Sequence, residues 1–170
     1  VRSIARSLEG IATMPDPEKR RVLDAMVRSA AKEEGVSAAY ANFEHGEFFG
    51  ASEGTPDRKP GASYFKDGAG KVVVEPAGYD ASIDSSAGWY WTSLREGREC
   101  LVEPYRYVYL PGMDSILMIS ITVPVRLGGA VVGVAGIDVT LERLQKLTST
   151  IQPTPGSYAI LVSNAAVRAA

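Results

Sequence analysis

The stretch that decides the fold class reads Ile-Leu-Met-Ile-Ser-Ile-Thr-Val-Pro-Val (116–125), Arg-Leu-Gly-Gly (126–129) and Ala-Val-Val-Gly-Val-Ala-Gly-Ile-Asp-Val (130–139). Its two apolar halves are short and rich in β-branched residues, and a Gly-Gly turn separates them, which is typical of a β-hairpin. Just upstream, Tyr-Arg-Tyr-Val-Tyr (105–109) alternates with the period of two that marks a strand. The last third of the chain therefore predicts a three-stranded antiparallel meander.

Helices are predicted on both sides of this region. Apolar residues recur at helical spacing over residues 1–11, and a second apolar helix face runs over 22–30, with Gly35 as its C-terminal stop. The sequence Asp-Pro-Glu (16–18) suits the start of the second helix, because Asp can cap it and Pro fits its first turn. A last short helix is predicted over 141–151.

The middle of the chain predicts short strands and loops. Residues 36–43 and 48–50 have the texture of a hairpin, and the Gly- and Pro-rich segment 52–60 indicates a loop. A short strand is predicted over 71–75 and a short helix over 89–97. Helices segregated from an antiparallel sheet define an α+β fold, and the segment count predicts a central five-stranded sheet with a helix on one face.

The composition argues against several classes of protein. The 170 residues carry a net charge of −2 without a basic block, so no nucleic-acid partner is expected. The apolar segments are interrupted and fall short of the ~20 residues that cross a bilayer. With one histidine, His45, and one cysteine, Cys100, most zinc and haem sites are ruled out, and we expect no metal and no cofactor.

We also expect no enzymatic activity. A nucleophile needs a base beside it, and His45 lies in a predicted turn. The segment Gly-Val-Ala-Gly (133–136) lies inside a predicted strand and lacks the spacing of a dinucleotide-binding fingerprint. Glycine in a strand instead lets another backbone or a ligand approach closely. A small hydrolase is the enzymatic alternative, and the sequence offers it no convincing nucleophile–base pair.

Four short motifs carry a resemblance to a known family. They are Trp-Tyr (89–90), Glu-Pro-Tyr (103–105), Ser-Ile-Thr-Val-Pro-Val (120–125) and Gly-Val-Ala-Gly-Ile-Asp-Val-Thr-Leu (133–141). In this order and spacing they resemble the Cache family, the PAS-like extracytoplasmic sensor domains of methyl-accepting chemotaxis proteins and sensor histidine kinases. The resemblance implies a ligand pocket between the sheet and a small helical segment, and a long N-terminal helix often used for dimer contacts.

The same resemblance implies a place in a larger receptor. It implies a periplasmic or extracellular location, membrane attachment through transmembrane segments outside this chain, and a homodimer in the full receptor. Residues 1–152 would form the Cache-type ligand-sensing module. The tail 153–170, with strand character over 157–163, looks like the start of a truncated second module, as in a double-Cache receptor.

The family also suggests a ligand class. Its amino-acid-binding members place an Arg shortly before the Trp to grip the ligand carboxylate, and residues 80–88 contain neither Arg nor Lys. The ammonium-binding half does match, at Trp89, Tyr105 and Asp138. We therefore expect a small amine or quaternary ammonium ligand, with Asp138 as counter-ion and aromatic walls from Trp89 and Tyr105, since aromatic faces attract cations.

Further residues complete the candidate ligand site. They are Tyr90, Tyr107, Asp84 and Asp80, the two Asp residues as a second acidic contact. Structural readings stay open beside this one: Trp89 and Tyr90 as core aromatics, Asp138 as the N-cap of the following helix, and Tyr107 as a residue of a sheet face.

Two alternative functions remain at this point. A sensor of amino acids or small carboxylates would need Arg106, Arg95 or a backbone amide in place of the missing Arg. A PAS-like module that binds another protein without a small ligand is the other alternative.

Overall fold

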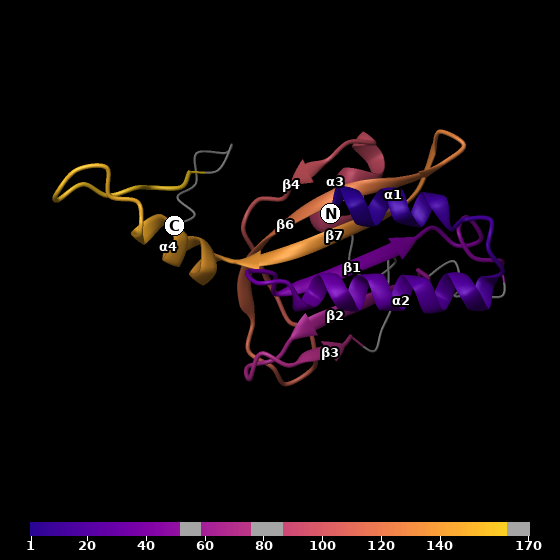
Figure 1. Cartoon of the computed structure of the whole chain (residues 1–170), viewed down its shortest axis with the longest axis horizontal. Helices are drawn as coiled ribbons and strands as arrows, with labels where there is room; N and C mark the ends of the chain where they lie inside the picture. The colour runs from indigo at the N-terminus through magenta and orange to yellow at the C-terminus, as the bar shows by residue number, and fades with distance from the viewer. Residues whose placement is uncertain (52–58, 76–86, 163–170) are drawn as a thin grey trace.

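The computed structural model describes residues 1–51, 59–75 and 87–162 and shows an α+β fold built on one antiparallel sheet (Figure 1). The strands are β1 (Ala38–Phe43), β2 (Gly61–Lys66), β3 (Val72–Val74), β4 (Cys100–Leu101), β5 (Tyr105–Tyr107), β6 (Ile116–Leu127) and β7 (Ala130–Thr140). The helices are α1 (Arg2–Gly10), α2 (Asp16–Lys32), α3 (Gly88–Glu96) and α4 (Leu141–Ser149). The α+β class predicted from the sequence is confirmed.

The predicted meander is confirmed and forms one half of the sheet. β6 and β7 pair along almost their whole length, and Gly128 and Gly129 turn between them with positive φ values of 56° and 91°. β5 pairs with the first residues of β6, as the alternation of tyrosines predicted. β7 also pairs with β1, so that it is a central strand of the sheet.

The other half of the sheet differs from the prediction. The sheet has seven strands in the order β3-β2-β1-β7-β6-β4, with β5 beside β6, where the sequence predicted five. The outer partner of β1 is β2, which lies in a segment that the sequence analysis did not assign to a strand. Residues 48–50 do not form the predicted return strand, and residues 157–161 do not form the predicted final strand.

Packing explains why residues 48–50 resembled a strand. Phe48 and Phe49 are 3% and 1% exposed, and the Phe48 ring stacks on Phe43 with 4.0 Å between ring centroids. Lys19, itself buried in α2, donates to the backbone oxygen of Phe48 over 2.5 Å. The apolar residues of this segment are therefore used to pack a turn beneath α2 and not to extend a hairpin.

Helices α1 and α2 cover one face of the sheet (Figure 1). Their apolar faces, which include Leu8, Leu23 and Val27, pack against Phe43 and Val125 in a common core. The helical periodicity of both segments is confirmed. The prediction that Asp16 caps α2 was wrong: the N-cap is Pro15, and the Asp16 side chain instead pairs with Lys19 and accepts from Gly50 N.

Helix α3 packs against the opposite face of the sheet. Successive residues of a strand point to opposite faces, and Tyr40 of β1 contacts the α3 residues while its neighbours Ala39 and Ala41 belong to the core under α1 and α2. Of the candidate ligand-binding residues that the structure describes, Trp89, Tyr90 and Tyr105 pack around Tyr40 on this second face.

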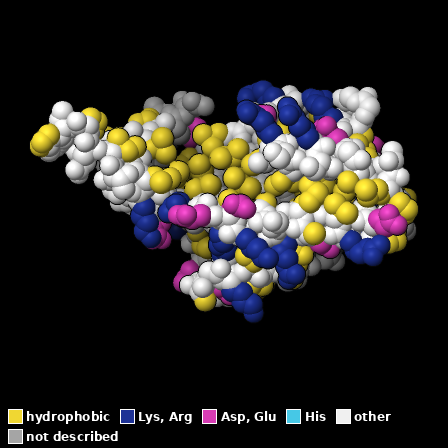
Figure 2. All heavy atoms as spheres, in the orientation of Figure 1, with side chains coloured by type: hydrophobic (Ala, Val, Ile, Leu, Met, Phe, Trp, Pro, Cys, Tyr) yellow, Lys and Arg dark blue, Asp and Glu magenta, His cyan; other side chains and the backbone are white. Residues whose placement is uncertain are grey.

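The surface beside α1 carries exposed apolar side chains. Hydrophobic side chains form a patch beside α1 over β6 and β7 (Figure 2). The exposed large hydrophobic residues include Leu101, Leu117 and Ile121 of β4 and β6, with exposed fractions of 58%, 37% and 37%. Among the described residues, no helix combines the length and the apolar character needed to cross a bilayer.

Candidate functional site

Asp138 is the buried acidic residue at the centre of the candidate site. It lies on β7 opposite Ser120 of β6, and its side chain is 3% exposed. Ser120 Oγ donates to one carboxylate oxygen over 2.6 Å, and the Tyr109 hydroxyl donates to the other over 2.8 Å. The N-cap of α4 is Thr140, whose side chain accepts from Arg143 N, so Asp138 does not serve as the cap.

The electrostatic environment of Asp138 favours its neutral form. Burial raises the pKa of this carboxyl to about 7, the bonds from Ser120 and Tyr109 partly oppose that rise, and the nearby Glu75 adds to it. Within the described residues, none of the hydrogen bonds or ion pairs of Asp138 comes from Lys or Arg. The site therefore holds a buried carboxylate that hydroxyl groups satisfy and that no cationic side chain of the described residues neutralises.

Three tyrosines before β6 form a wall beside this carboxylate. The rings of Tyr105 and Tyr107 lie 6.4 Å apart, and those of Tyr107 and Tyr109 lie 5.1 Å apart, in edge-to-face geometry. The Tyr105 hydroxyl lies 2.7 Å from Ser120 Oγ. Because Ser120 gives its single hydrogen to Asp138, Tyr105 is the donor in that pair. Burial raises the pKa of all three phenols, so they remain neutral donors.

Glu75 carries the second carboxylate near this wall. It is partly buried, and the sequence analysis did not select it. It follows β3, accepts from Tyr107 over 2.9 Å and accepts from Ser63 over 2.6 Å. Burial raises the pKa of its carboxyl, and the two hydroxyl donors oppose that rise. The signal in the sequence was one acidic residue at the end of Val-Val-Val (72–74), which is a weak signal because strands often end in polar residues.

Tyr40 is the second residue that the sequence analysis missed. It is 5% exposed, and its ring meets Trp89 edge-on at a centroid distance of 4.7 Å. Its hydroxyl is buried and has no hydrogen-bond partner among the described residues, although it lies near Asp138, Tyr105 and Ser120. A buried donor without a partner is costly, so this hydroxyl points to a place for a ligand or a water molecule.

The predicted residues Trp89 and Tyr90 both lie on α3 and have different surroundings. Trp89 is 7% exposed and contacts Tyr40, which joins it to the group around Asp138. Tyr90 is fully buried, and its hydroxyl donates over 2.6 Å to Glu44, which also pairs with Lys59. Tyr90 thus binds to a separate charged pair, and its assignment to the ligand site stays a prediction.

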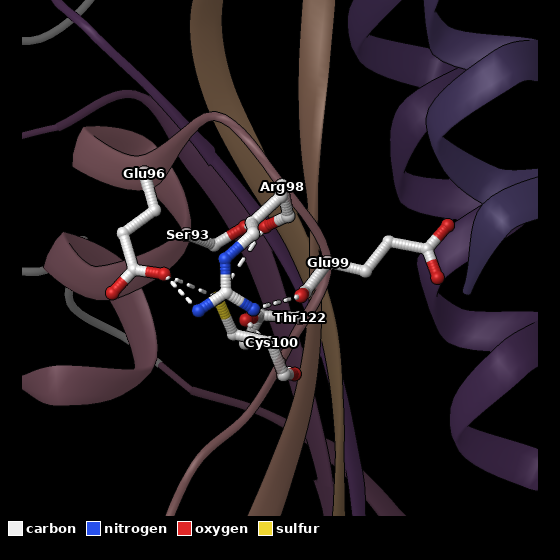
Figure 3. Close-up of polar contacts among 6 residues, drawn as sticks. All are labelled: Ser93, Glu96, Arg98, Glu99, Cys100 and Thr122. Carbon is white, nitrogen blue, oxygen red and sulfur yellow. Dashed lines mark hydrogen bonds and ion pairs between the residues drawn. The ribbon is translucent and has the colours of Figure 1, made fainter.

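A network at the C-terminal end of α3 fixes this helix on the sheet (Figure 3). Ser93 Oγ donates to the backbone oxygen of Arg98 over 2.9 Å, and the Arg98 side chain pairs with Glu96. Thr122 Oγ1 donates to the backbone oxygen of Cys100, so that β6 binds the segment that leaves α3. The helix that carries Trp89 is therefore held in place from outside the candidate site.

The remaining sequence candidates lie elsewhere. Asp80 and Asp84 are outside the described residues. Arg106 reaches Ser115 over 3.4 Å at the surface, and Arg95 lies 5.0 Å from the centre of the Trp91 ring, so neither has a described contact with Asp138. Among the described residues no group of three or more His, Cys, Asp or Glu side chains is placed to hold a metal ion.

A hollow of about 370 Å³ lies between α1 and the segment joining α3 to β4. Its charged lining residues are Arg2, Arg6, Glu9, Arg98, Glu99 and Arg126. Lys and Arg side chains gather beside α1 in Figure 2. Arg2 pairs with Glu99 over 2.5 Å, and Arg126 donates to the backbone oxygen of Gly97 over 2.6 Å. These arginines bind α1 and the β6–β7 hairpin to the segment after α3, which is a structural role.

The fold matches those of solved sensory domains. An extracellular domain assigned to the histidine kinase mmHK1S-Z3 has a TM-score of 0.73 at 23% identity, over 99% of this chain and 59% of that chain. The ligand-binding domain of the Pseudomonas aeruginosa chemoreceptor PctC, in complex with GABA, has a TM-score of 0.59 at 23% identity, over 99% and 62%. The chain therefore has the Cache-like fold of the extracellular sensory domains of chemoreceptors and histidine kinases.

Curated relatives point to the same class of protein. The methyl-accepting chemotaxis protein PscA of Pseudomonas syringae pv. tomato is 31% identical over 103 residues, which cover 59% of this chain and 16% of PscA. The methyl-accepting chemotaxis protein TlpQ of Pseudomonas aeruginosa is 38% identical over 60 residues, 35% of this chain and 8% of TlpQ. The chain thus spans less than a fifth of the length of these relatives. No family model matches the chain.

Proposed function

We propose that this chain is the ligand-sensing domain of a transmembrane chemoreceptor or sensor kinase and that it signals by movement, not by catalysis. The support is the Cache-like fold together with curated relatives that are methyl-accepting chemotaxis proteins. Solved neighbours are described as extracellular or periplasmic domains, which supports a location outside the cytoplasm for this domain. The boundary between a module at 1–152 and a second module starting in 153–170 stays a prediction.

The ligand in this proposal carries an ammonium group that binds beside Asp138. The observation that carries it is the burial of this carboxylate, whose side-chain hydrogen bonds within the described residues come from hydroxyl groups. Ionisation of a carboxylate that is buried in an apolar site is unfavourable, and the electrostatic attraction of a bound cation offsets that unfavourable free energy. Ligand binding would therefore be coupled to the ionisation of Asp138.

Aromatic rings supply the rest of the proposed contact. Trp89 and Tyr40 meet edge-on next to Tyr105, and aromatic faces attract cations by about 0.5–2 kcal/mol each. The unpartnered Tyr40 hydroxyl adds a polar group for the ligand. This combination of one carboxylate, several rings and neutral hydroxyls favours an amine or a quaternary ammonium ion.

The alternative ligand class is amino acids or small carboxylates. Solved neighbours are described in complex with GABA, L-Arg and L-valine, and each of these carries an ammonium group as well as a carboxylate. The ammonium half of such a ligand would suit Asp138. The carboxylate half would need a cationic partner, and among the described residues the side-chain partners of Asp138 are hydroxyl groups, not Lys or Arg.

Thermal unfolding against a panel of amines, quaternary ammonium ions, amino acids and organic acids tests this proposal. A ligand at about 100 times its dissociation constant adds about 2.7 kcal/mol of stability, which raises Tm by several degrees. We expect amines to raise Tm and Asp138→Asn to abolish the shift. Shifts from carboxylates alone would overturn the amine proposal, and a panel without any effect would favour a ligand-free interaction module.

We also propose that the domain forms a homodimer in the full receptor. The exposed apolar side chains Leu101, Leu117 and Ile121 and the hydrophobic patch beside α1 in Figure 2 support this proposal, because such patches mark contact surfaces. Sedimentation equilibrium of the domain tests it. Replacement of Ile121 by Ser should weaken self-association, and a monomer at all concentrations in both forms would contradict the proposal for the domain alone.

A further inference from the structure

We propose that the ligand of this domain carries two cationic groups, one bound beside Asp138 and the other beside Glu75. This inference rests on the proposed function, because it assumes that Asp138 receives an ammonium group. It adds Glu75 as a second anchoring residue and narrows the ligand class to diamines and related dications.

The two carboxylates belong to one connected group of side chains. Asp138 accepts from Tyr109, Glu75 accepts from Tyr107, and the rings of these two tyrosines are 5.1 Å apart. The carboxylates are close enough for Glu75 to raise the pKa of Asp138 further. The wall of tyrosines thus links two acidic positions on the same face of the sheet.

Both carboxylates have the same kind of partner. Glu75 is bound by the hydroxyls of Ser63 and Tyr107, as Asp138 is bound by hydroxyls of Ser120 and Tyr109. In the part of the chain that the structure describes, neither carboxylate is paired with Lys or Arg. Like charges close together disfavour ionisation of both, so one ammonium group would leave the second position uncompensated.

Tyr40 provides an independent sign of a ligand at this place. Its hydroxyl is buried, lacks a described partner and lies near Asp138, Tyr105 and Tyr107. Its ring continues the aromatic wall towards Trp89. Aromatic rings that connect two carboxylates suit an apolar alkyl segment between two ammonium groups, because rings contact both methylene groups and cations favourably.

The test compares two ligand series by isothermal titration calorimetry at pH 8. One series is linear α,ω-diamines of increasing chain length, and the other is monoamines with the same number of carbons. We expect the best diamine to bind at least about tenfold more tightly than its matched monoamine, with an optimum chain length set by the separation of the two carboxylates. Equal affinities of both series at every length would overturn the inference.

Two variants test whether Glu75 binds the second ammonium group of a diamine. Glu75→Gln should lower diamine affinity much more than monoamine affinity, because only the diamine has a second ammonium group to lose, whereas Glu47→Gln removes an exposed charge and should change neither affinity. Equal losses for both ligands in Glu75→Gln would contradict the assignment. The wild-type length series decides the question even if Glu75→Gln does not fold.

The two proposals fail in different ways. Monoamine binding that depends on Asp138, without a preference for diamines, would overturn the dication inference and keep the proposed amine sensor. The absence of binding for every amine would overturn both. Binding of diamines that persists in Asp138→Asn would overturn the role of Asp138 in both.

Discussion

The ring of Tyr40 lies over the α-carbon of Gly136, its partner residue on the neighbouring strand β7. A β-carbon built on Gly136 would come within 2.3 Å of the ring carbon that carries the Tyr40 hydroxyl. Glycine at position 136 is therefore what allows an aromatic ring to lie flat on the sheet between Trp89 and Asp138. This packing connects the stability of the sheet to the shape of the candidate site.

Replacement of Gly136 by Ala should lower the stability of the sheet and change the shape of the candidate site. The added methyl group must displace Tyr40, and overpacking of this kind costs about 1–3 kcal/mol. We expect a lower midpoint of urea unfolding and weaker amine binding in the same variant. Gly68→Ala is the matched control, because its β-carbon would meet nothing within 4 Å. A Gly136→Ala protein with wild-type stability and affinity would show that Tyr40 can move freely.

The stability of the ligand-free domain should depend on pH through Asp138. Its pKa in the folded protein is about 7, above the ordinary value of about 3.9 in the unfolded chain. Below pH 4 the carboxyl group is protonated in the folded and the unfolded protein and does not destabilise the fold. As the pH rises from 4 to 7 the folded state loses stability, and above pH 7 the loss stays constant. Over this window the loss is up to about 4 kcal/mol.

Asp138→Asn tests that dependence, since an amide does not titrate. Urea titration without ligand should show that the variant becomes more stable relative to the wild type between pH 5 and pH 8, because only the wild type loses stability as Asp138 ionises. Asp114→Asn, at an exposed position, serves as the control. If the difference between wild type and Asp138→Asn is the same at both pH values, then Asp138 does not change its ionisation on folding.

Ligand affinity should change with pH in the opposite sense. An ammonium ion binds the ionised form of Asp138, and the free domain holds a proton there below about pH 7. Affinity should therefore fall by up to about tenfold for each pH unit below this value, and binding near pH 6 should release a proton. A quaternary ammonium ligand is suitable, because its own charge does not change with pH.

Calorimetry in buffers of different ionisation enthalpy measures this proton release. Glu75 and the tyrosines 105, 107 and 109 face the same group, and the phenols stay neutral over this range because burial raises their pKa values. Besides Asp138, Glu75 is then the carboxyl group of this site that can add to the proton release. Proton uptake on binding, in place of release, would be incompatible with a cation at Asp138.

We expect Lys19 of α2 to contribute to the stability of the fold. Its ammonium group is buried, donates to the backbone oxygen of Phe48 and pairs with Asp16 over 2.7 Å. Lys19→Met leaves both acceptors without this donor, which costs about 1–3 kcal/mol. Urea unfolding should show the loss, whereas Lys32→Met at an exposed position should not. A stable Lys19→Met protein would show that water replaces the ammonium group.

Much of the architecture followed from local sequence patterns. The hairpin at 116–139, the helix faces of α1 and α2 and the short helix at Trp89 all have periodicities or turn residues that act within a few positions. The expectation that Asp138 lies in a buried, aromatic setting came from the resemblance to a sensor family, and the environment of this residue agrees with it. Its role in ligand binding remains a prediction.

The errors have a common physical origin. Phe48 and Phe49 are apolar because they pack beneath α2, and the sequence does not distinguish that packing from strand pairing. The strand β2 follows a segment rich in Gly and Pro, which indicated a loop. It is held by pairing to β1, and pairing between segments separated by many residues depends on tertiary contacts more than on intrinsic preference.

The sequence by itself determined the α+β class and the central hairpin, because hydrophobic periodicity and turn chemistry are local properties. Its candidate site residues Trp89, Tyr105 and Asp138 came from the resemblance to a sensor family. The tertiary structure alone decided that Tyr40 lies over Gly136 and that Glu75 joins the wall of tyrosines beside Asp138. These residues come from strands far apart in the chain, and only the order and register of the sheet bring them to one face. Burial there removes water from both carboxylates, and that desolvation raises the pKa of both carboxyl groups.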